Sequence, residues 1–211
     1  MDVLSFVVFS FNTRYMLRWV LAGIILIVPV LDFLSLGYLW RTSGLSMIGG
    51  VGLPTWERKG ELWWEGARLT YIIILYEALP SFLCSLGFLL SRFDTFITHF
   101  IGHLMMFSAV IAFLLCSYFL PFAFCTLVES MEVRRAFDFE RIAWGVTEVF
   151  VPYTLGYALS ILCLYITYKL HRIPYIGVIL LLILPFYVLL VATYYFTQLF
   201  RKTRLSSGGL P

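Results

Sequence analysis

Long apolar stretches separated by polar connections dominate the sequence. Five of the stretches reach about 20 residues, the length that a helix needs to cross the hydrocarbon core of a bilayer. Each is a continuous apolar run rather than an alternation of apolar and polar positions, so the pattern predicts helices and not barrel strands. The windows are Leu17–Leu39, Leu69–Leu90, His99–Leu127, Val146–Leu170 and Tyr175–Phe200. The pattern therefore predicts an all-α, polytopic membrane protein with five apolar helical segments.

The first window contains a helix breaker. Pro29 removes a backbone donor near the middle of this window, and the ionisable Asp32 follows it. Two interpretations stay open. Either the window is one kinked span, or it forms two half-helices, Trp19–Val28 and Val30–Leu39, that enter and leave the membrane on the same side.

Composition excludes a soluble domain. Hydrophobic residues make up 61% of the 211 residues and charged residues only 13%, about half the charged share of soluble domains. The net charge of +3 is too small for a nucleic-acid-binding protein. The sequence also contains no nucleophile elbow, phosphate-binding loop or His-Glu-x-x-His motif, so no enzymatic activity is expected.

The chain is expected to form one transmembrane domain, because no internal repeat interrupts it. We assign residues 1–204 to this domain and residues 205–211, which contain Ser206-Ser207-Gly208-Gly209, to a flexible C-terminal tail.

Lysine and arginine are distributed unevenly between the two sides. If all five windows cross, one side carries five of them (Arg14, Arg18, Arg92, Lys169 and Arg172) and the other carries ten. If the first window re-enters, the ratio becomes twelve to three. Cations are enriched on the cytoplasmic side, so both interpretations predict a cytoplasmic C-terminus in a multi-pass protein of the cytoplasmic membrane.

Two connections on that side are expected to form amphipathic surface helices. The first is Trp56–Arg68, and the second is Glu129–Glu148. The first places three acidic residues on one stripe, and the second supplies three arginines: Glu57, Glu61 and Glu65 against Arg134, Arg135 and Arg141. We expect the two helices to pack into a cytoplasmic cap held by acid–arginine pairs, the alternative being that each lies alone on the headgroups.

Asp32 and Glu77 are the only ionisable residues deep inside apolar windows. Charges within the membrane are expensive, so such residues usually face protein or water and mark functional sites. Together with Pro29, Asp32 suits the broken-helix ion sites of transporters. Alternatively, Asp32 caps the second half-helix and Glu77 makes an interhelical hydrogen bond.

Three histidines are predicted on the side opposite the cap. His99 and His103 are four residues apart and share a helical face, and His171 lies in the tight turn before the last window. Three imidazoles would suffice for zinc or copper, or each could ligate a separate haem or pigment. The alternative is that they are interfacial residues. Our primary expectation is that the protein binds no cofactor.

Several segments resemble one known family. They are Phe11–Arg14, Pro29–Phe33 with Gly37-Tyr38, Leu53–Trp56 leading to Gly60–Leu62, Ala136–Phe139 and Tyr194–Gln198. The chain is similar in these segments to an uncharacterised family of prokaryotic multi-span membrane proteins, domain of unknown function number four-zero-one-three. The resemblance implies a membrane fold and carries no activity.

Three functions remain open. The first is a non-catalytic structural or accessory subunit that packs against other proteins, or against copies of itself, in the bilayer. The second is a small-solute or ion transporter or channel that uses the broken first helix. The third is a membrane subunit that binds a metal or redox cofactor.

Overall fold

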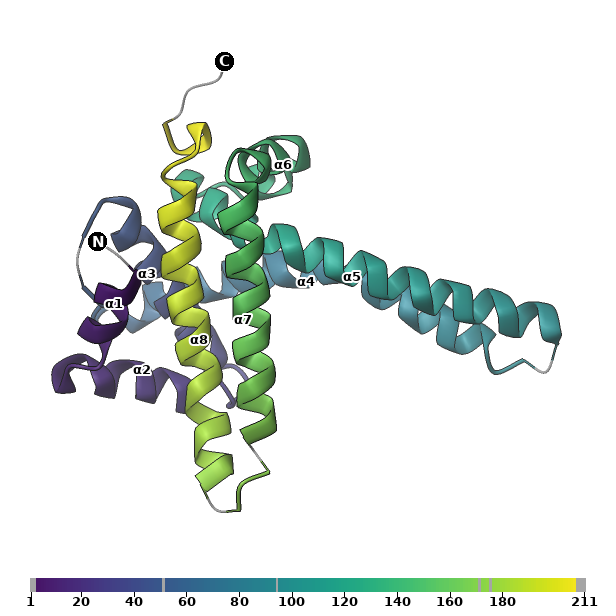
Figure 1. Ribbon diagram of the computed structural model, residues 1–211, viewed down its shortest axis with the longest axis horizontal. Helices are drawn as coiled ribbons and strands as arrows, with labels where there is room; N and C mark the ends of the chain where they lie inside the picture. Colours follow the sequence, from purple (N-terminus) through teal and green to yellow (C-terminus); the bar gives the residue numbers. More distant parts are fainter. Residues whose placement is uncertain (1–2, 51, 94, 171, 175, 208–211) are drawn as a thin grey trace. The chain divides into compact units, whose positions relative to one another are not determined.

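Secondary structure in the described part of the chain consists of α-helices and two short 3-10 helices. The computed structural model describes residues 3–50, 52–93, 95–170, 172–174 and 176–207, with the side chains of Arg14 and Ser207 also outside the description. The elements are α1 Val3–Ser10, α2 Thr13–Ile25, α3 Asp32–Met47, α4 Lys59–Leu90, α5 Phe96–Ser130, η1 Val133–Phe137, α6 Phe139–Glu148, α7 Phe150–Leu170, α8 Ile176–Phe200 and η2 Arg204–Ser207 (Figure 1).

Four of the described helices are long and apolar enough to cross a membrane: α4, α5, α7 and α8. The sequence predicted five such segments, and the missing one is the first window. Its residues are divided between α2 and α3, which have 13 and 16 residues and are separated by residues 26–31. A helix rises about 1.5 Å per residue, so neither helix reaches the roughly 30 Å of a hydrocarbon core.

The structure also differs from the prediction of two separate surface helices. Residues 59–68 are not a separate helix but the first turns of α4, which continues without interruption into the second apolar window. The second connection is divided, because α5 continues to Ser130 and is followed by η1 and α6. Met131, between α5 and η1, has a φ of 58°, a left-handed conformation that ends the helix there.

The chain divides into two compact units, Met1–Thr70 with Phe122–Pro211 and Tyr71–Pro121, and each is considered by itself. In the first unit α8 packs against α7, α2 and α3 (Figure 1). Aromatic side chains fill this core: the ring of Phe122 lies 4.7 Å from that of Tyr153 and 5.4 Å from that of Phe200, all three fully buried. Hydroxyl groups join α3 to α8, with Ser43 Oγ 2.9 Å from Thr197 Oγ1.

Glycines allow α3 and the first turns of α4 to touch through their backbones. A Cβ atom added at Gly66 would overlap the carbonyl oxygen of Phe33, and one added at Gly37 would overlap the carbonyl oxygen of Leu62. Larger residues would push the helices apart, so these two positions set the spacing of the α3–α4 crossing.

The second unit is the hairpin formed by the membrane-spanning parts of α4 and α5. A Cβ added at Gly87 would lie 2.8 Å from the carbonyl oxygen of Gly102, and one added at Gly102 would lie 2.7 Å from that of Gly87. The two helices of the hairpin therefore approach closely at this glycine pair.

Candidate functional site

The connection between α2 and α3 carries backbone strain beside an acidic residue. Val30 has a φ of 74°, a conformation that β-branched residues rarely adopt. Its carbonyl oxygen accepts a hydrogen bond of 3.1 Å from the indole Nε1 of Trp63 in α4. This bond ties the connection to the first turns of α4.

Asp32 lies in the first turn of α3 and is half-buried. Its Oδ1 accepts a hydrogen bond of 2.9 Å from the backbone N–H of Phe33, while its own N–H donates to the carbonyl of Val28. A carboxylate at a helix N-terminus is favourable because the first amides carry partial positive charge. The local contacts fit a structural role at the start of α3, and they leave a role in ion binding open.

Arg41 in α3 is the cation that the acidic stripe faces. Its Nε donates to Glu65 at 2.8 Å, and its terminal nitrogens reach Glu61 at 3.7 Å and the backbone carbonyl of Glu57 at 2.7 Å. Only 18% of the Arg41 side chain is exposed, so water screens its pair with Glu65 less than a surface pair. Arg58 adds a second contact to Glu61, at 3.6 Å.

The arginines that were expected opposite the acidic stripe have other partners. Arg135 pairs with Glu132 within its own segment at 3.0 Å, and a terminal nitrogen of Arg141 donates to the carbonyl of Leu205. Among the described residues no ion pair joins Arg134 to the stripe. The ion pairs thus differ from the predicted ones because α3 brings a closer cation. A cytoplasmic cap that contains the six charged residues stays a prediction.

Helix α6 is amphipathic, as expected for the second connection. Asp138 precedes it and accepts a hydrogen bond from the backbone N–H of Arg141, which caps its N-terminus. Ile142 and Val146 are buried, whereas the large side chain of Trp144 is 71% exposed. An exposed indole on a polar helix is typical of the membrane–water interface.

Two cavities lie within the first unit. The larger, about 590 Å³, is bounded by α3, the start of α4 and the end of α5. It has apolar walls such as Trp40 and Val128, and its charged lining residues are Arg41, Glu65 and Glu129.

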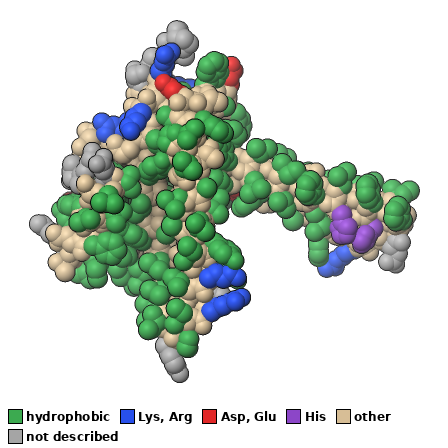
Figure 2. All heavy atoms as spheres, viewed as in Figure 1, with side chains coloured by type: hydrophobic (Ala, Val, Ile, Leu, Met, Phe, Trp, Pro, Cys, Tyr) green, Lys and Arg blue, Asp and Glu red, His purple; other side chains and the backbone are tan. Residues whose placement is uncertain are grey.

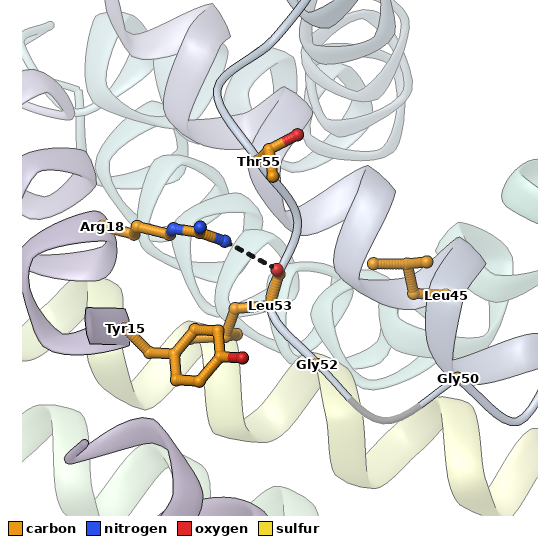
Figure 3. A pocket seen from close by; sticks show the side chains of 7 residues that line it. All are labelled: Tyr15, Arg18, Leu45, Gly50, Gly52, Leu53 and Thr55. Carbon is orange, nitrogen blue, oxygen red and sulfur yellow. Dashed lines mark hydrogen bonds between the residues drawn. The ribbon is translucent and has the colours of Figure 1, made fainter. Parts of the chain in front are cut away.

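The smaller cavity has a volume of about 360 Å³, and its charged lining residue is Arg18 (Figure 3). Arg18 points across it, and one terminal nitrogen donates to the carbonyl oxygens of Leu53 and Pro54 at 3.1 and 3.2 Å. The guanidinium carbon of Arg18 lies 5.4 Å from the centroid of the Tyr15 ring. Because its hydrogen bonds go to the main chain, Arg18 fixes the Leu53-Pro54 segment against α2.

Tyr38 and Trp56 form a stacked aromatic pair with buried polar atoms. Their ring centroids are 5.0 Å apart, and neither the Tyr38 hydroxyl nor the Trp56 Nε1 has a hydrogen-bond partner among the described residues. Burial raises the pKa of Tyr38 well above its ordinary value, and the nearby Arg18 guanidinium partly offsets this. The tyrosine therefore stays neutral at physiological pH.

The second unit contains the remaining described candidates. Glu77 is half-buried in α4, and no hydrogen bond or ion pair joins its carboxylate to another described residue. His99 and His103 lie on one face of α5 with ring centroids 4.4 Å apart. His171 lies outside the described residues. No cluster of three or more metal-ligating side chains occurs in the described part of the chain.

Sequence reasoning missed Arg41, Arg18 and the Tyr38–Trp56 pair. Arg41 lies two residues after the first apolar window and precedes the acidic stripe in the same connection. That proximity was an available signal, whereas the predicted partners were the arginines of the second connection, Glu129–Glu148. Nothing in the sequence pairs Arg18 with Leu53 and Pro54, because those contacts depend on how α2 meets the chain before α4.

These features define a helical membrane-embedded protein, with four apolar helices of spanning length and a polar cluster at the α3–α4 junction. The chain belongs to the family described as protein of unknown function (DUF4013), whose model matches residues 20–173. This confirms the resemblance seen in the sequence. No curated protein and no solved structure matches the chain significantly.

Proposed function

We propose that this protein is a non-catalytic structural or accessory subunit that packs against other protein chains in the membrane. The observation that carries the proposal is a small-residue face on α5. Ser108 is exposed and Ala112 is half-exposed, on a helix whose other exposed positions are mostly large apolar residues. Small residues let helix backbones approach closely in lipid, where helix association depends on packing.

The low burial of the spanning helices supports the same proposal. In their most apolar windows, between 11% and 33% of residues are buried within the chain. Lipid or another protein must therefore cover most of each helix. Gly156 in α7 does not offer a comparable face, because the ring of Tyr195 in α8 covers it.

We place the protein in the cytoplasmic membrane with a cytoplasmic C-terminus. If only α4, α5, α7 and α8 cross, the chain before α4 and the chain after α8 lie on one side. That side then carries twelve of the fifteen lysines and arginines, which agrees with the positive-inside rule. In this arrangement α2 and α3 do not cross.

The test is native mass spectrometry of the full chain extracted in mild detergent and in native nanodiscs. A second protein in fixed ratio is expected. The Ser108→Phe variant should weaken its retention about tenfold, since it fills the small-residue face. Val110→Phe is the matched control, because Val110 is also exposed but lies about 200° around the same helix.

Equal retention by the two variants would contradict the role of the Ser108 face. A single chain in both environments, or a complex containing only copies of this chain, would overturn the subunit proposal.

A second candidate function is transport of a small solute or ion, and the strained α2–α3 connection favours it. Val30 and Asp32 lie where helical hydrogen bonding is interrupted, as in the discontinuous helices that coordinate ions in transporters.

The test of this second candidate is proton flux into liposomes containing the purified protein and a pH-sensitive dye. Transport predicts flux that Asp32→Asn abolishes and that Asp138→Asn, at the exposed start of α6, leaves unchanged. Equal flux in liposomes with and without protein would exclude proton transport.

A further inference from the structure

Two exposed histidines lie next to each other on the hairpin of α4 and α5. His99 and His103 are four residues apart in α5, so they project from the same face one turn apart. Their ring centroids are 4.4 Å apart, with the ring planes inclined at 71°. Figure 2 shows histidine side chains together at the surface of this hairpin.

The ring nitrogens of both residues are available. Among the described residues, no hydrogen bond or ion pair occupies either imidazole, and the two rings contact each other. A neutral imidazole is a preferred ligand for zinc and copper. Two histidines at this spacing on one helical face are also a known way to hold zinc.

Because both histidines belong to one helix, the second imidazole is held close to an ion that the first one binds. Once one imidazole holds an ion, the other is presented by the same rigid element, which raises its effective concentration. No third histidine, cysteine or acidic residue joins the pair within the described chain. The protein thus supplies two ligands, and solvent is left to complete the coordination.

We propose that His99 and His103 chelate one Zn²⁺ or Cu²⁺ ion at the exposed face of α5. The site needs neither His171 nor the partner protein of the proposed function, so either proposal can fail without the other. It narrows the three-histidine expectation to the two histidines that the structure brings together.

The test uses the purified full-length protein in detergent, with Cu²⁺ alone as the paramagnetic probe and Zn²⁺ titrated calorimetrically. One ion per chain is expected, with two imidazole nitrogens in the Cu²⁺ electron paramagnetic resonance spectrum. His99→Ala and His103→Ala should each weaken binding on the order of 100-fold, the loss expected when a chelate becomes a single ligand. His171→Ala should bind like the unaltered protein.

A variant with the same amino-acid composition shows whether binding depends on the spacing of the two histidines or only on their number. The double change His103→Leu with Leu104→His keeps three histidines but rotates the second imidazole about 140° away from the first. Leu104 is 55% exposed, so the exchange leaves buried packing intact. This variant should lose binding as far as His103→Ala does. Absence of binding, a one-imidazole spectrum, or a loss of less than tenfold in the exchanged variant would each overturn the proposal.

Discussion

At the scale of single residues, Arg41 decides how the charged connection before α4 is organised. Glu61 and Glu65 lie one turn apart in α4 and repel each other, and Glu57 lies just before the helix begins. Arg41 offsets this by contacting Glu65, Glu61 and the carbonyl of Glu57 from the neighbouring helix α3. One partly buried side chain therefore offsets the repulsion between two carboxylates and ties the start of α4 to α3.

The first prediction concerns this arginine. Arg41→Gln should lower the free energy of unfolding by about 2 kcal/mol, the usual value of a hydrogen bond to a charged group. Arg58→Gln is the control: Arg58 is 76% exposed and makes one longer contact, so the expected change is within about 0.5 kcal/mol. Unfolding by sodium dodecyl sulfate in mixed micelles measures both. Equal losses in the two variants would show that Arg41 has no special role.

The second prediction concerns backbone strain at Val30. A left-handed conformation costs an L-residue about 1–2 kcal/mol, and glycine avoids that cost while increasing the entropy of the unfolded chain. Val30→Gly should therefore stabilise the protein by about 0.5–1 kcal/mol.

Val28→Gly is the control for this change. Val28 is similarly exposed but is not among the residues with positive φ. It should lose stability in the same unfolding assay, because the unfolded chain gains entropy without relief of strain. Destabilisation by Val30→Gly would contradict the strained conformation.

At the scale of elements, the crossing of α3 and α4 depends on direct backbone contact. The oxygen atoms that face Gly37 and Gly66 belong to the main chain and cannot rotate away, unlike a flexible side chain. Added volume at these positions must move a whole helix. The Arg41 cluster lies on the same two helices, so this spacing also positions its charges.

The third prediction tests this crossing. Gly66→Ala should destabilise the protein by about 3 kcal/mol, the upper part of the usual range for overpacking. Gly60→Ala is the matched control, since it adds the same methyl group to the same helix where nothing lies within 4 Å. It should be neutral or stabilise by up to about 1 kcal/mol, because alanine favours helix more than glycine does. Thermal unfolding in one detergent compares the two, and equal effects would contradict the close crossing.

At the scale of the whole molecule, the number of spans sets which segments share a side of the membrane. Four crossing helices place the N-terminal segment with the C-terminus, whereas a fifth crossing would place it opposite. The broken first window therefore decides the topology of everything that precedes α4.

The fourth prediction follows from that topology. In a variant without the four native cysteines, Asn12→Cys should resist a membrane-impermeant thiol reagent added outside intact cells. Ile173→Cys, in the turn between α7 and α8, should be labelled, because the proposed topology puts that turn on the outer side. Both positions are exposed, so access to the thiol is comparable. Labelling of residue 12 from outside would show that the first window crosses.

Sequence patterns predicted the spanning helices because each apolar run is helical for a local reason that does not depend on the rest of the fold. Backbone groups in lipid must be paired within the segment, so length and hydropathy suffice for α4, α5, α7 and α8. The pattern did not show that residues 59–68 continue into α4 or that the second connection is divided between η1 and α6. It likewise failed to identify Arg41, because a charge stripe shows that a cation is needed but not which one is near.

By itself, then, the sequence determined the environment, the helical class and the family of this protein, since these depend on composition, local periodicity and recurrent motifs. Tertiary structure alone decided the partners of the charged residues, the α3–α4 crossing and the stacking of Tyr38 on Trp56. These features depend on distances between side chains and between backbones, which are fixed only when the helices have formed and packed.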